Sequence, residues 1–218
     1  MRARKKAWTG QEIETNERII KNATDHKGKW AEYFENSNPI HIEIGCGKGR
    51  FIVQNASQNP DINYLAFERE EHVIVMGARA SREIPCSLGF IIGDVEQLAD
   101  YFAEDELDRL YINFCDPWPG RKKWHKRRLT HVNFLNVYKR LLKDGSEIHF
   151  KTDNKELYEF SLNSFSDNGW RLKNITLDLH NSGFEGNVVT EYEEKFSSIG
   201  MPIYRCEAYI VQTHNCNK

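Results

Sequence analysis

Acidic residues stand at or just after the ends of four short apolar segments, at spacings that suit a shared ligand site. They are Glu43, Glu68, Asp94 and Asp116. If the segments form neighbouring parallel strands, their carboxyl ends meet at one rim, where α/β proteins bind ligands. Carboxylates at that rim could attract a cationic ligand or accept hydrogen bonds from ribose hydroxyl groups, and they would repel a pyrophosphate.

A glycine-rich loop follows the first of these acids. Gly45, Gly47 and Gly49 lie between an expected strand over 39–44 and an expected helix over 49–57. The dinucleotide-binding fingerprint requires its third glycine where Arg50 stands, so a nucleotide cofactor without a pyrophosphate fits better. S-adenosylmethionine, with a sulfonium and an ammonium against one carboxylate, suits the acidic rim. The alternatives are a tight turn without a ligand, a solvated charge at Glu68 and a simple helix cap at Asp94.

A second candidate loop surrounds Asp116. Pro117 and Pro119 restrict the backbone on both sides of Trp118, which predicts a rigid carboxylate beside an aromatic ring that could orient and stack a planar base. A basic run over 121–128 follows, and it also contains Trp124 and His125, a mixture typical of phosphate contact with stacking. Its six basic residues are Arg121, Lys122, Lys123, Lys126, Arg127 and Arg128. Ordinary solvated charge is the alternative interpretation of this run.

Two polar clusters follow further along the chain. Asp153 comes at the end of an expected strand over 147–151, where it could bind a ligand or cap a helix. The cluster Thr190, Glu191, Tyr192 and Glu193 has the spacing of a capping box, and taken alone it favours capping over ligand contact. No arrangement of Ser, Cys or His indicates a nucleophilic mechanism, and no metal site is predicted.

The elements that would position these residues alternate between strand and helix. Strands are expected over 39–44, 62–67, 89–92, 107–114, 147–151, 170–179 and 203–212, and helices over 11–34 with an interruption, 49–57, 70–82, 95–102, 128–143, 154–165 and from about 190. Lys143-Asp144-Gly145 is expected to end the helix over 128–143. The pattern predicts an α/β fold with a mostly parallel sheet, an antiparallel C-terminal strand pair and helices on both faces.

Composition excludes several classes of protein. The 218 residues include 39% hydrophobic and 28% charged residues, which is ordinary for a globular chain. No apolar stretch reaches the roughly 18 residues of a membrane span, and no signal peptide is evident, so we expect a cytoplasmic protein. The five cysteines form no Cys-x-x-Cys pair, which favours reduced thiols.

The net charge of −2 conceals two concentrated basic segments, residues 1–6 and the run 121–128. A polyanion could bind at these segments although the rest of the chain is acidic. We expect a basic N-terminal arm and helical extension over 1–35, and a single domain over 36–218. The sequence indicates no obligate protein partner and is compatible with a monomer or a homodimer.

Taken together, these motifs make the chain similar to the bacterial tRNA (guanine-N7)-methyltransferase family, over nearly its whole length. The resemblance rests on the basic start, residues 43–49, Phe67-Glu68, Gly93-Asp94, Asp116-Pro-Trp-Pro119, residues 126–129, 149–154 and 190–193. It implies a Rossmann-like S-adenosylmethionine-dependent methyltransferase fold with seven strands, and methylation of a guanine in the variable loop of tRNA.

The resemblance also implies roles for individual residues. Asp116 would be catalytic; the cofactor would be bound by Glu43, Gly45, Gly47, Gly49, Glu68, Asp94 and Asp116; Asp153 and Thr190 to Glu193 would contact the substrate. Family members often have a lysine directly after the Asp-Pro-Trp-Pro motif, and here Gly120-Arg121-Lys122 stands in its place. Arg121 and Lys122 are therefore both candidates for that role.

Three alternative functions remain open at this point. Acid-proline-aromatic loops also serve enzymes that methylate exocyclic amino groups, so another nucleic-acid atom could be the target. A non-catalytic tRNA-binding module would retain the fold without turnover. A nicotinamide-dependent oxidoreductase is disfavoured by Arg50 and the acidic rim.

Overall fold

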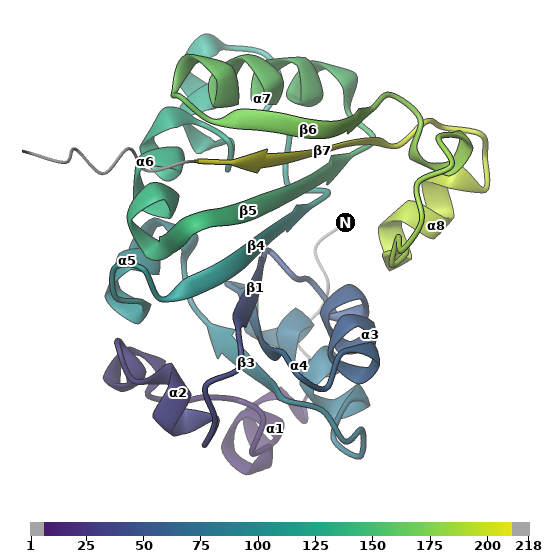
Figure 1. Ribbon diagram of the computed structural model, residues 1–218. Coiled ribbons are helices and arrows are strands. Elements are labelled where there is room, and N and C mark those ends of the chain that lie inside the picture. Colours follow the sequence, from purple (N-terminus) through teal and green to yellow (C-terminus); the bar gives the residue numbers. More distant parts are fainter. Residues whose placement is uncertain (1–6, 211–218) are drawn as a thin grey trace, which may run out of the picture.

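The computed structural model describes residues 7–210, and it is built on one seven-stranded sheet with the order β3-β2-β1-β4-β5-β7-β6 (Figure 1). Strand β7 is antiparallel to both of its neighbours, and the other neighbouring pairs are parallel. The predicted mostly parallel sheet with an antiparallel C-terminal pair is confirmed. The strands are β1 Ile40–Ile44, β2 Asn63–Glu68, β3 Leu88–Ile92, β4 Leu107–Asn113, β5 Leu142–Thr152, β6 Arg171–Thr176 and β7 Tyr204–Tyr209.

Helices cover both faces of the sheet, as expected. Helices α3 and α4 connect β1, β2 and β3, whereas α6 and α7 connect β4, β5 and β6 in the opposite direction across the sheet. Because such crossovers are right-handed, the two pairs of helices cover opposite faces. The α-helices are α1 Thr9–Thr15, α2 Trp30–Tyr33, α3 Arg50–Gln58, α4 Glu71–Ala80, α5 Leu98–Tyr101, α6 Val132–Leu141, α7 Lys155–Asp167 and α8 Glu191–Ser197, and the 3-10 helices are η1 Ala23–His26, η2 Val95–Gln97, η3 Lys122–Arg127 and η4 Leu179–Asn181.

The central strands are buried on both faces, and this burial includes polar side chains such as His41 and Glu43 of β1. Every residue of β1 is buried, and Ile42 and Ile44 are fully inaccessible to solvent. Burial on both faces is characteristic of parallel strands between two helix layers. Successive strands are added toward one edge of the sheet from β1 to β3, and toward the other edge from β4 onward. The switch point between the parallel strands β1 and β4 is where ligands bind in such folds.

Two helix predictions were wrong in their extent. Between α1 and η1 the chain forms turns on either side of a single bridge from Ile19 to Phe90 of β3, and the Arg18 guanidinium donates to backbone carbonyls of the 84–88 segment. Helix α6 begins at Val132, because residues 128–131 form a turn closed by the bond from His131 N to Arg128 O. Helix α6 ends at Leu141, two residues earlier than predicted. Lys143-Asp144-Gly145 lies inside β5, whose first residue, Leu142, pairs with Leu107.

Among the described residues, no helix is both long enough and apolar enough to cross a bilayer. The basic segment 1–6 and the expected end of the last strand, beyond residue 210, lie outside the described residues.

Candidate active site

The glycine loop joins β1 to α3 and depends on backbone angles that side chains disfavour. Gly45, Gly47 and Gly49 have φ angles of 69°, 56° and 72°, in the left-handed region that favours glycine. Glu68 holds this loop, since its Oε2 accepts a hydrogen bond from the Gly47 amide at 3.1 Å. Its Oε1 accepts from the backbone amides of residues 69 and 70. The Glu68 carboxylate at the end of β2 therefore holds the backbone of the glycine loop and of residues 69 and 70, and it also faces the rim.

Glu43 is buried at the end of β1. Its Oε1 accepts a hydrogen bond of 2.8 Å from Asn113 Nδ2, while its Oε2 has no hydrogen-bond partner among the described residues. Burial raises the pKa of Glu43 to about 8, although the bond from Asn113 and the charge of Lys151 act in the opposite direction. The unused acceptor makes this carboxyl group responsive to a cation placed beside it.

Two adjoining cavities bring the predicted rim residues together. The first, of about 520 Å³, is lined by Glu68, Asp94 and Asp116, together with Trp118 and Arg127. The second, of about 600 Å³, is lined by Glu43, the glycine loop and the start of α8. The two share Gly45 and Phe114 in their walls. The four predicted acids therefore do surround one composite site.

Asp94 also has the local role that its sequence suggested. Its Oδ1 accepts a hydrogen bond of 3.0 Å from the Glu96 amide and so caps η2. Its other oxygen lies 3.9 Å from the Arg69 guanidinium. Capping and cavity lining are compatible at this position, because a carboxylate oxygen has more than one lone pair.

The loop after β4 holds Asp116 in an exposed position between two strained residues. Phe114 and Trp118 have φ angles of 52° and 43°, which cost free energy for residues with large side chains. The Phe114 amide donates to the Lys151 carbonyl at 2.9 Å, and the Arg127 guanidinium lies 4.7 Å from the centre of the Trp118 ring. Asp116 and Trp118 line the same cavity, on a backbone that is held on both sides of Asp116.

The basic run divides into exposed residues and one buried residue. Lys126 and Arg127 are exposed, as are Arg121 and Lys122. Arg128 departs from the predicted phosphate-contacting pattern, because it is only 1% exposed. Its Nε donates to the Pro117 carbonyl at 2.8 Å, and its Nη2 lies 2.6 Å from a Glu156 carboxylate oxygen. The Arg128 guanidinium thus ties the Asp116 loop to helix α7.

The cluster 190–193 likewise contains both buried and exposed residues. Thr190 and Glu193 form a complete capping box at the start of α8, and Glu193 is fully buried. Glu191 and Tyr192 are exposed and line the 600 Å³ cavity. Burial, together with the negative charges of Asp153 and Asp116, raises the pKa of Tyr192. Asp153, Asp116 and Tyr192 therefore lie close enough to interact electrostatically.

Comparison with known proteins identifies this arrangement. A family model described as "Putative methyltransferase" matches residues 37–206. A protein of Clostridioides difficile (strain 630) named tRNA (guanine-N(7)-)-methyltransferase is 52% identical over 95% of this chain and 97% of its own length. One of the same name from Bacillus subtilis (strain 168) is 49% identical over 95% of this chain and 98% of its own. The chain belongs to this methyltransferase family.

Solved structures with the same fold are much more distant in sequence. A structure titled as that of an antibiotic-related methyltransferase has a TM-score of 0.62 at 16% identity, and covers 87% of this chain and 94% of its own. That of the 16S rRNA methyltransferase KamB has a TM-score of 0.62 at 14% identity, over 84% and 93%. These similarities establish the Rossmann-like methyltransferase fold.

Sequence reasoning missed two residues of this methyltransferase site, Asn113 and Lys151. They are paired across β4 and β5, and both are buried although their side chains are polar. Asn113 holds Glu43, and the Lys151 ammonium contacts Glu193 at 2.7 Å. The available signal was a polar residue at or next to the carboxyl end of each strand, on the rim where the predicted acids lie.

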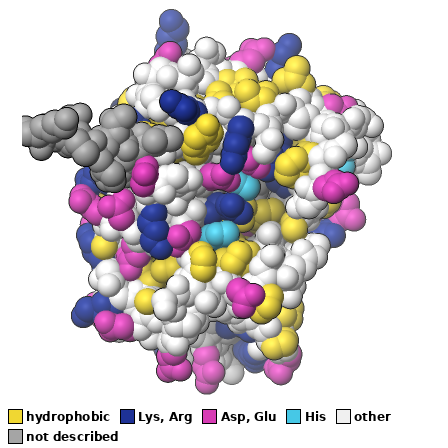
Figure 2. All heavy atoms as spheres, viewed as in Figure 1, with side chains coloured by type: hydrophobic (Ala, Val, Ile, Leu, Met, Phe, Trp, Pro, Cys, Tyr) yellow, Lys and Arg dark blue, Asp and Glu magenta, His cyan; other side chains and the backbone are white. Residues whose placement is uncertain are grey.

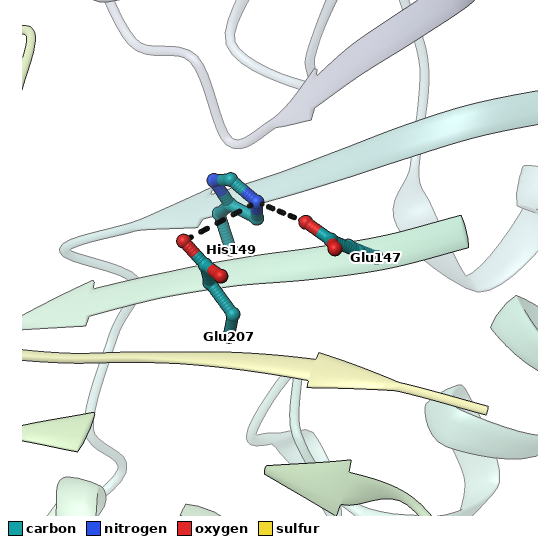
Figure 3. A group of neighbouring side chains, drawn as sticks. All are labelled: Glu147, His149 and Glu207. Atoms are coloured by element: carbon teal, nitrogen blue, oxygen red, sulfur yellow. Dashed lines mark hydrogen bonds and ion pairs between the residues drawn. The ribbon is translucent and has the colours of Figure 1, made fainter. Parts of the chain in front are cut away.

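A separate charged network lies further along β5 and β7. His149 Nε2 is 2.8 Å from a Glu147 oxygen and 3.8 Å from a Glu207 oxygen (Figure 3). Charged and His side chains also gather at the centre of this face of the methyltransferase (Figure 2). Arg205 and Lys173 form ion pairs with these carboxylates, and the bond from His149 is the main cause that lowers the pKa of Glu147 to about 2. Carboxylates that already have cationic partners are poor candidates for binding a metal ion.

Proposed function

We propose that this protein transfers the methyl group of S-adenosyl-L-methionine to N7 of a guanine in the variable loop of tRNA, in the cytoplasm. The observation that carries the proposal is the identity of about 50% with the named relatives, over nearly the full length of both chains. The acidic composite site described above supports it independently.

The residues at the rim fit the cofactor. S-adenosyl-L-methionine, when bound, supplies an electrophilic methyl group on a positively charged sulfur, next to an ammonium group. Glu43 offers a buried and unused acceptor atom, and the carboxylates in the adjoining cavity suit a cationic ligand. The proposed cofactor-binding residues are Glu43, Gly45, Gly47, Gly49, Glu68, Asp94 and Asp116.

Asp116 is the proposed catalytic residue. Guanine N7 has a free lone pair and no proton, so the transfer requires no general base. Asp116 instead stabilises the positive charge that moves onto the purine, while the rigid loop holds it in place. Correct orientation of N7 can contribute roughly 7–11 kcal/mol toward lowering the barrier. Trp118, beside Asp116, would replace part of the stacking that the target base loses when it leaves its neighbours.

The surrounding side chains divide into those that contact RNA and those that support them. Exposed bases around the loop are proposed to bind tRNA phosphates, namely Arg121, Lys122, Lys126 and Arg127. Asp153, Glu191 and Tyr192 are proposed to face the target nucleotide. Thr190, Glu193 and Arg128 are proposed to hold the backbone in place, because their polar groups already bond within the protein.

We also propose that residues 36–218 form the methyltransferase domain and that residues 1–35 form an extension. The family match begins at residue 37, and the described part of the extension packs beside β3 through Ile19.

The test is methyl transfer from labelled S-adenosyl-L-methionine to unmodified tRNA, with identification of the product nucleoside. We expect 7-methylguanosine, which also makes the tRNA sensitive to strand scission after reduction. A methylated adenine would support the alternative target atom. Absence of cofactor binding in calorimetry would support the non-catalytic tRNA-binding module.

A further inference from the structure

Helix α8 carries two proposed substrate contacts, yet it lies beyond the ends of β5 and β7, apart from the helices that cover the sheet (Figure 1). Two ion pairs connect it to the glycine-loop side of the site, Lys48 with Glu191 and Arg50 with Glu194. All four side chains are about half exposed. Exposed pairs of this kind contribute little to stability, so a buried contact is better placed to hold the helix in position.

That contact is made by Lys151, which is 4% exposed near the end of β5. Its ammonium group lies 2.7 Å from Glu193 Oε2, 3.0 Å from Asn187 Oδ1 and 3.0 Å from the Val188 carbonyl. An ammonium has three N–H donors, and these three acceptors use all of them. Two of the acceptors lie in the segment that leads into α8, and the third lies in its first turn.

The Glu193 carboxylate also contacts three groups other than Lys151. Its Oε2 also accepts from the Thr190 amide, which completes the capping box. Its Oε1 accepts from Asn187 Nδ2 at 2.7 Å and lies 3.1 Å from His180 Nε2. A single buried carboxylate therefore connects the sheet, the preceding segment and the start of α8.

The same lysine also holds the opposite side of the site. Its carbonyl accepts from the Phe114 amide at 2.9 Å, two residues before Asp116. Its strand partner is Asn113, which donates to Glu43. The main chain of Lys151 thus supports the Asp116 loop, and its side chain supports α8.

We propose that Lys151 is a positioning residue of this enzyme, which through its buried bond to Glu193 sets helix α8 at a fixed distance from the Asp116 loop, so that Glu191 and Tyr192 face the target guanine. This inference rests on the proposed function for its substrate, but the contact that it describes is a property of the protein alone. The aromatic contact of 5.2 Å between the rings of Tyr192 and Phe114 is the point where the two sides meet.

The experiment compares hydrogen exchange of the α8 amides, residues 191–197, in three proteins without substrate. Lys151→Met alone leaves the Glu193 charge buried without its partner, which can prevent folding, so the decisive variant is Lys151→Met/Glu193→Gln, in which both charges are removed. We expect α8 to exchange at least about tenfold faster in the double variant, with β1 and β4 unchanged, because local opening of the helix becomes easier. The control Lys48→Met removes an exposed pair to the same helix, and we expect less than about a twofold change. Unchanged exchange of α8 in the double variant would overturn the proposal.

Kinetics at saturating cofactor provide the second measurement. We expect the double variant to raise KM for tRNA about tenfold or more, with a smaller effect on kcat, because displaced contacts weaken substrate positioning. Arg140→Met, which removes an exposed pair remote from the site, is the matched control. A fall in kcat at unchanged KM would contradict a role through α8. If the wild-type protein methylates no tRNA, the proposed function fails, while the exchange experiment still decides whether Lys151 fixes the helix.

Discussion

Two walls enclose the site, and they are fixed in different ways. The loop wall, residues 113–131, carries Asp116 and the basic run, and the helix wall, residues 187–197, carries Glu191 and Tyr192. Arg128 anchors the loop wall through Glu156, whose side chain is 59% exposed. Lys151 anchors the helix wall through Glu193, and both of these side chains are almost completely buried.

The loop wall has further restraints that the helix wall lacks. Two prolines flank Trp118, and the backbone is held in strained conformations at Phe114 and Trp118. The proposed catalytic group thus lies on the wall whose own backbone is stiff. Because catalysis of this transfer depends on orientation, this comparison leads us to assign the chemistry to the loop wall and substrate holding to the helix wall.

The largest expected effect separates these two assignments. Asp116→Asn should fold and bind tRNA but lose about 100-fold or more in single-turnover rate, because the amide retains the shape without the charge that opposes the developing purine cation. The matched variant on the helix wall is Glu191→Gln, which should raise KM for tRNA with a smaller change in that rate. A rate for Asp116→Asn within about threefold of the wild-type value, equal to less than roughly 1 kcal/mol of barrier, would exclude a catalytic charge at Asp116.

The second prediction concerns the anchor of the loop wall. Arg128→Met should lower the free energy of unfolding by about 2–3 kcal/mol, since it removes the charge-assisted bond to the Pro117 carbonyl and leaves that partly buried acceptor unsatisfied. The ion pair adds little to this value because Glu156 is largely exposed. Urea denaturation measures the effect. Lys126→Met, two positions earlier and exposed, should change stability by less than about 0.5 kcal/mol, and equal losses in both variants would refute the distinction.

Arg128 and Glu193 also show which contacts could not be predicted from the sequence. The resemblance implies nucleic-acid or substrate contact for the motifs of both residues, whereas local spacing predicted only the capping role of Glu193, which the structure shows. Both side chains are buried against partners 28 and 42 residues away in the sequence. Pairing at such a distance leaves no local pattern. Neighbouring residues in the same motifs, such as Arg127 and Tyr192, are exposed, so composition alone cannot separate the two groups.

The acidic rim, in contrast, was predictable in detail. Each of its carboxylates follows an apolar run, and parallel strands necessarily bring such ends together. Glu43, Glu68, Asp94 and Asp116 accordingly surround the paired cavities. The extent of the N-terminal helix was not predictable, because contacts of Arg18 and Ile19 with the β3 region override local helical propensity.

The third prediction concerns Glu43 and is a pH dependence of cofactor binding. Because burial raises the pKa of Glu43 to about 8, this carboxyl group is mainly protonated at neutral pH in the free protein. A bound sulfonium or ammonium would favour the ionised form, so binding should release a proton below pH 8. Affinity should then rise with pH by up to about tenfold per unit.

Calorimetry in two buffers of different ionisation enthalpy measures this release. Glu43→Gln should show weaker and nearly pH-independent binding. The same raised pKa means that the folded state holds a proton that the unfolded state loses above about pH 4.5, so this group lowers stability as pH rises toward 8. Binding of the wild-type protein without proton release at pH 7 would contradict the assignment of Glu43.

The smallest expected effect lies on the outer surface of the loop wall. Lys126 and Arg127 are exposed beside Asp116, whereas Arg128 is buried, so the run 126–128 offers two phosphate contacts and not three. Replacing Lys126 and Arg127 with methionine should therefore reduce the slope of log affinity for tRNA against log salt concentration by about 1.5 to 2. Cofactor affinity should change much less than tRNA affinity, because the glycine loop and Glu68 belong to other strands; Arg127 does line the cavity that Glu68 and Asp116 also line, so cofactor affinity is measured alongside. Parallel lines for wild type and double variant would assign Lys126 and Arg127 to solvent, and would leave Arg121, Lys122 and residues 1–6 as the candidates for electrostatic contact with tRNA.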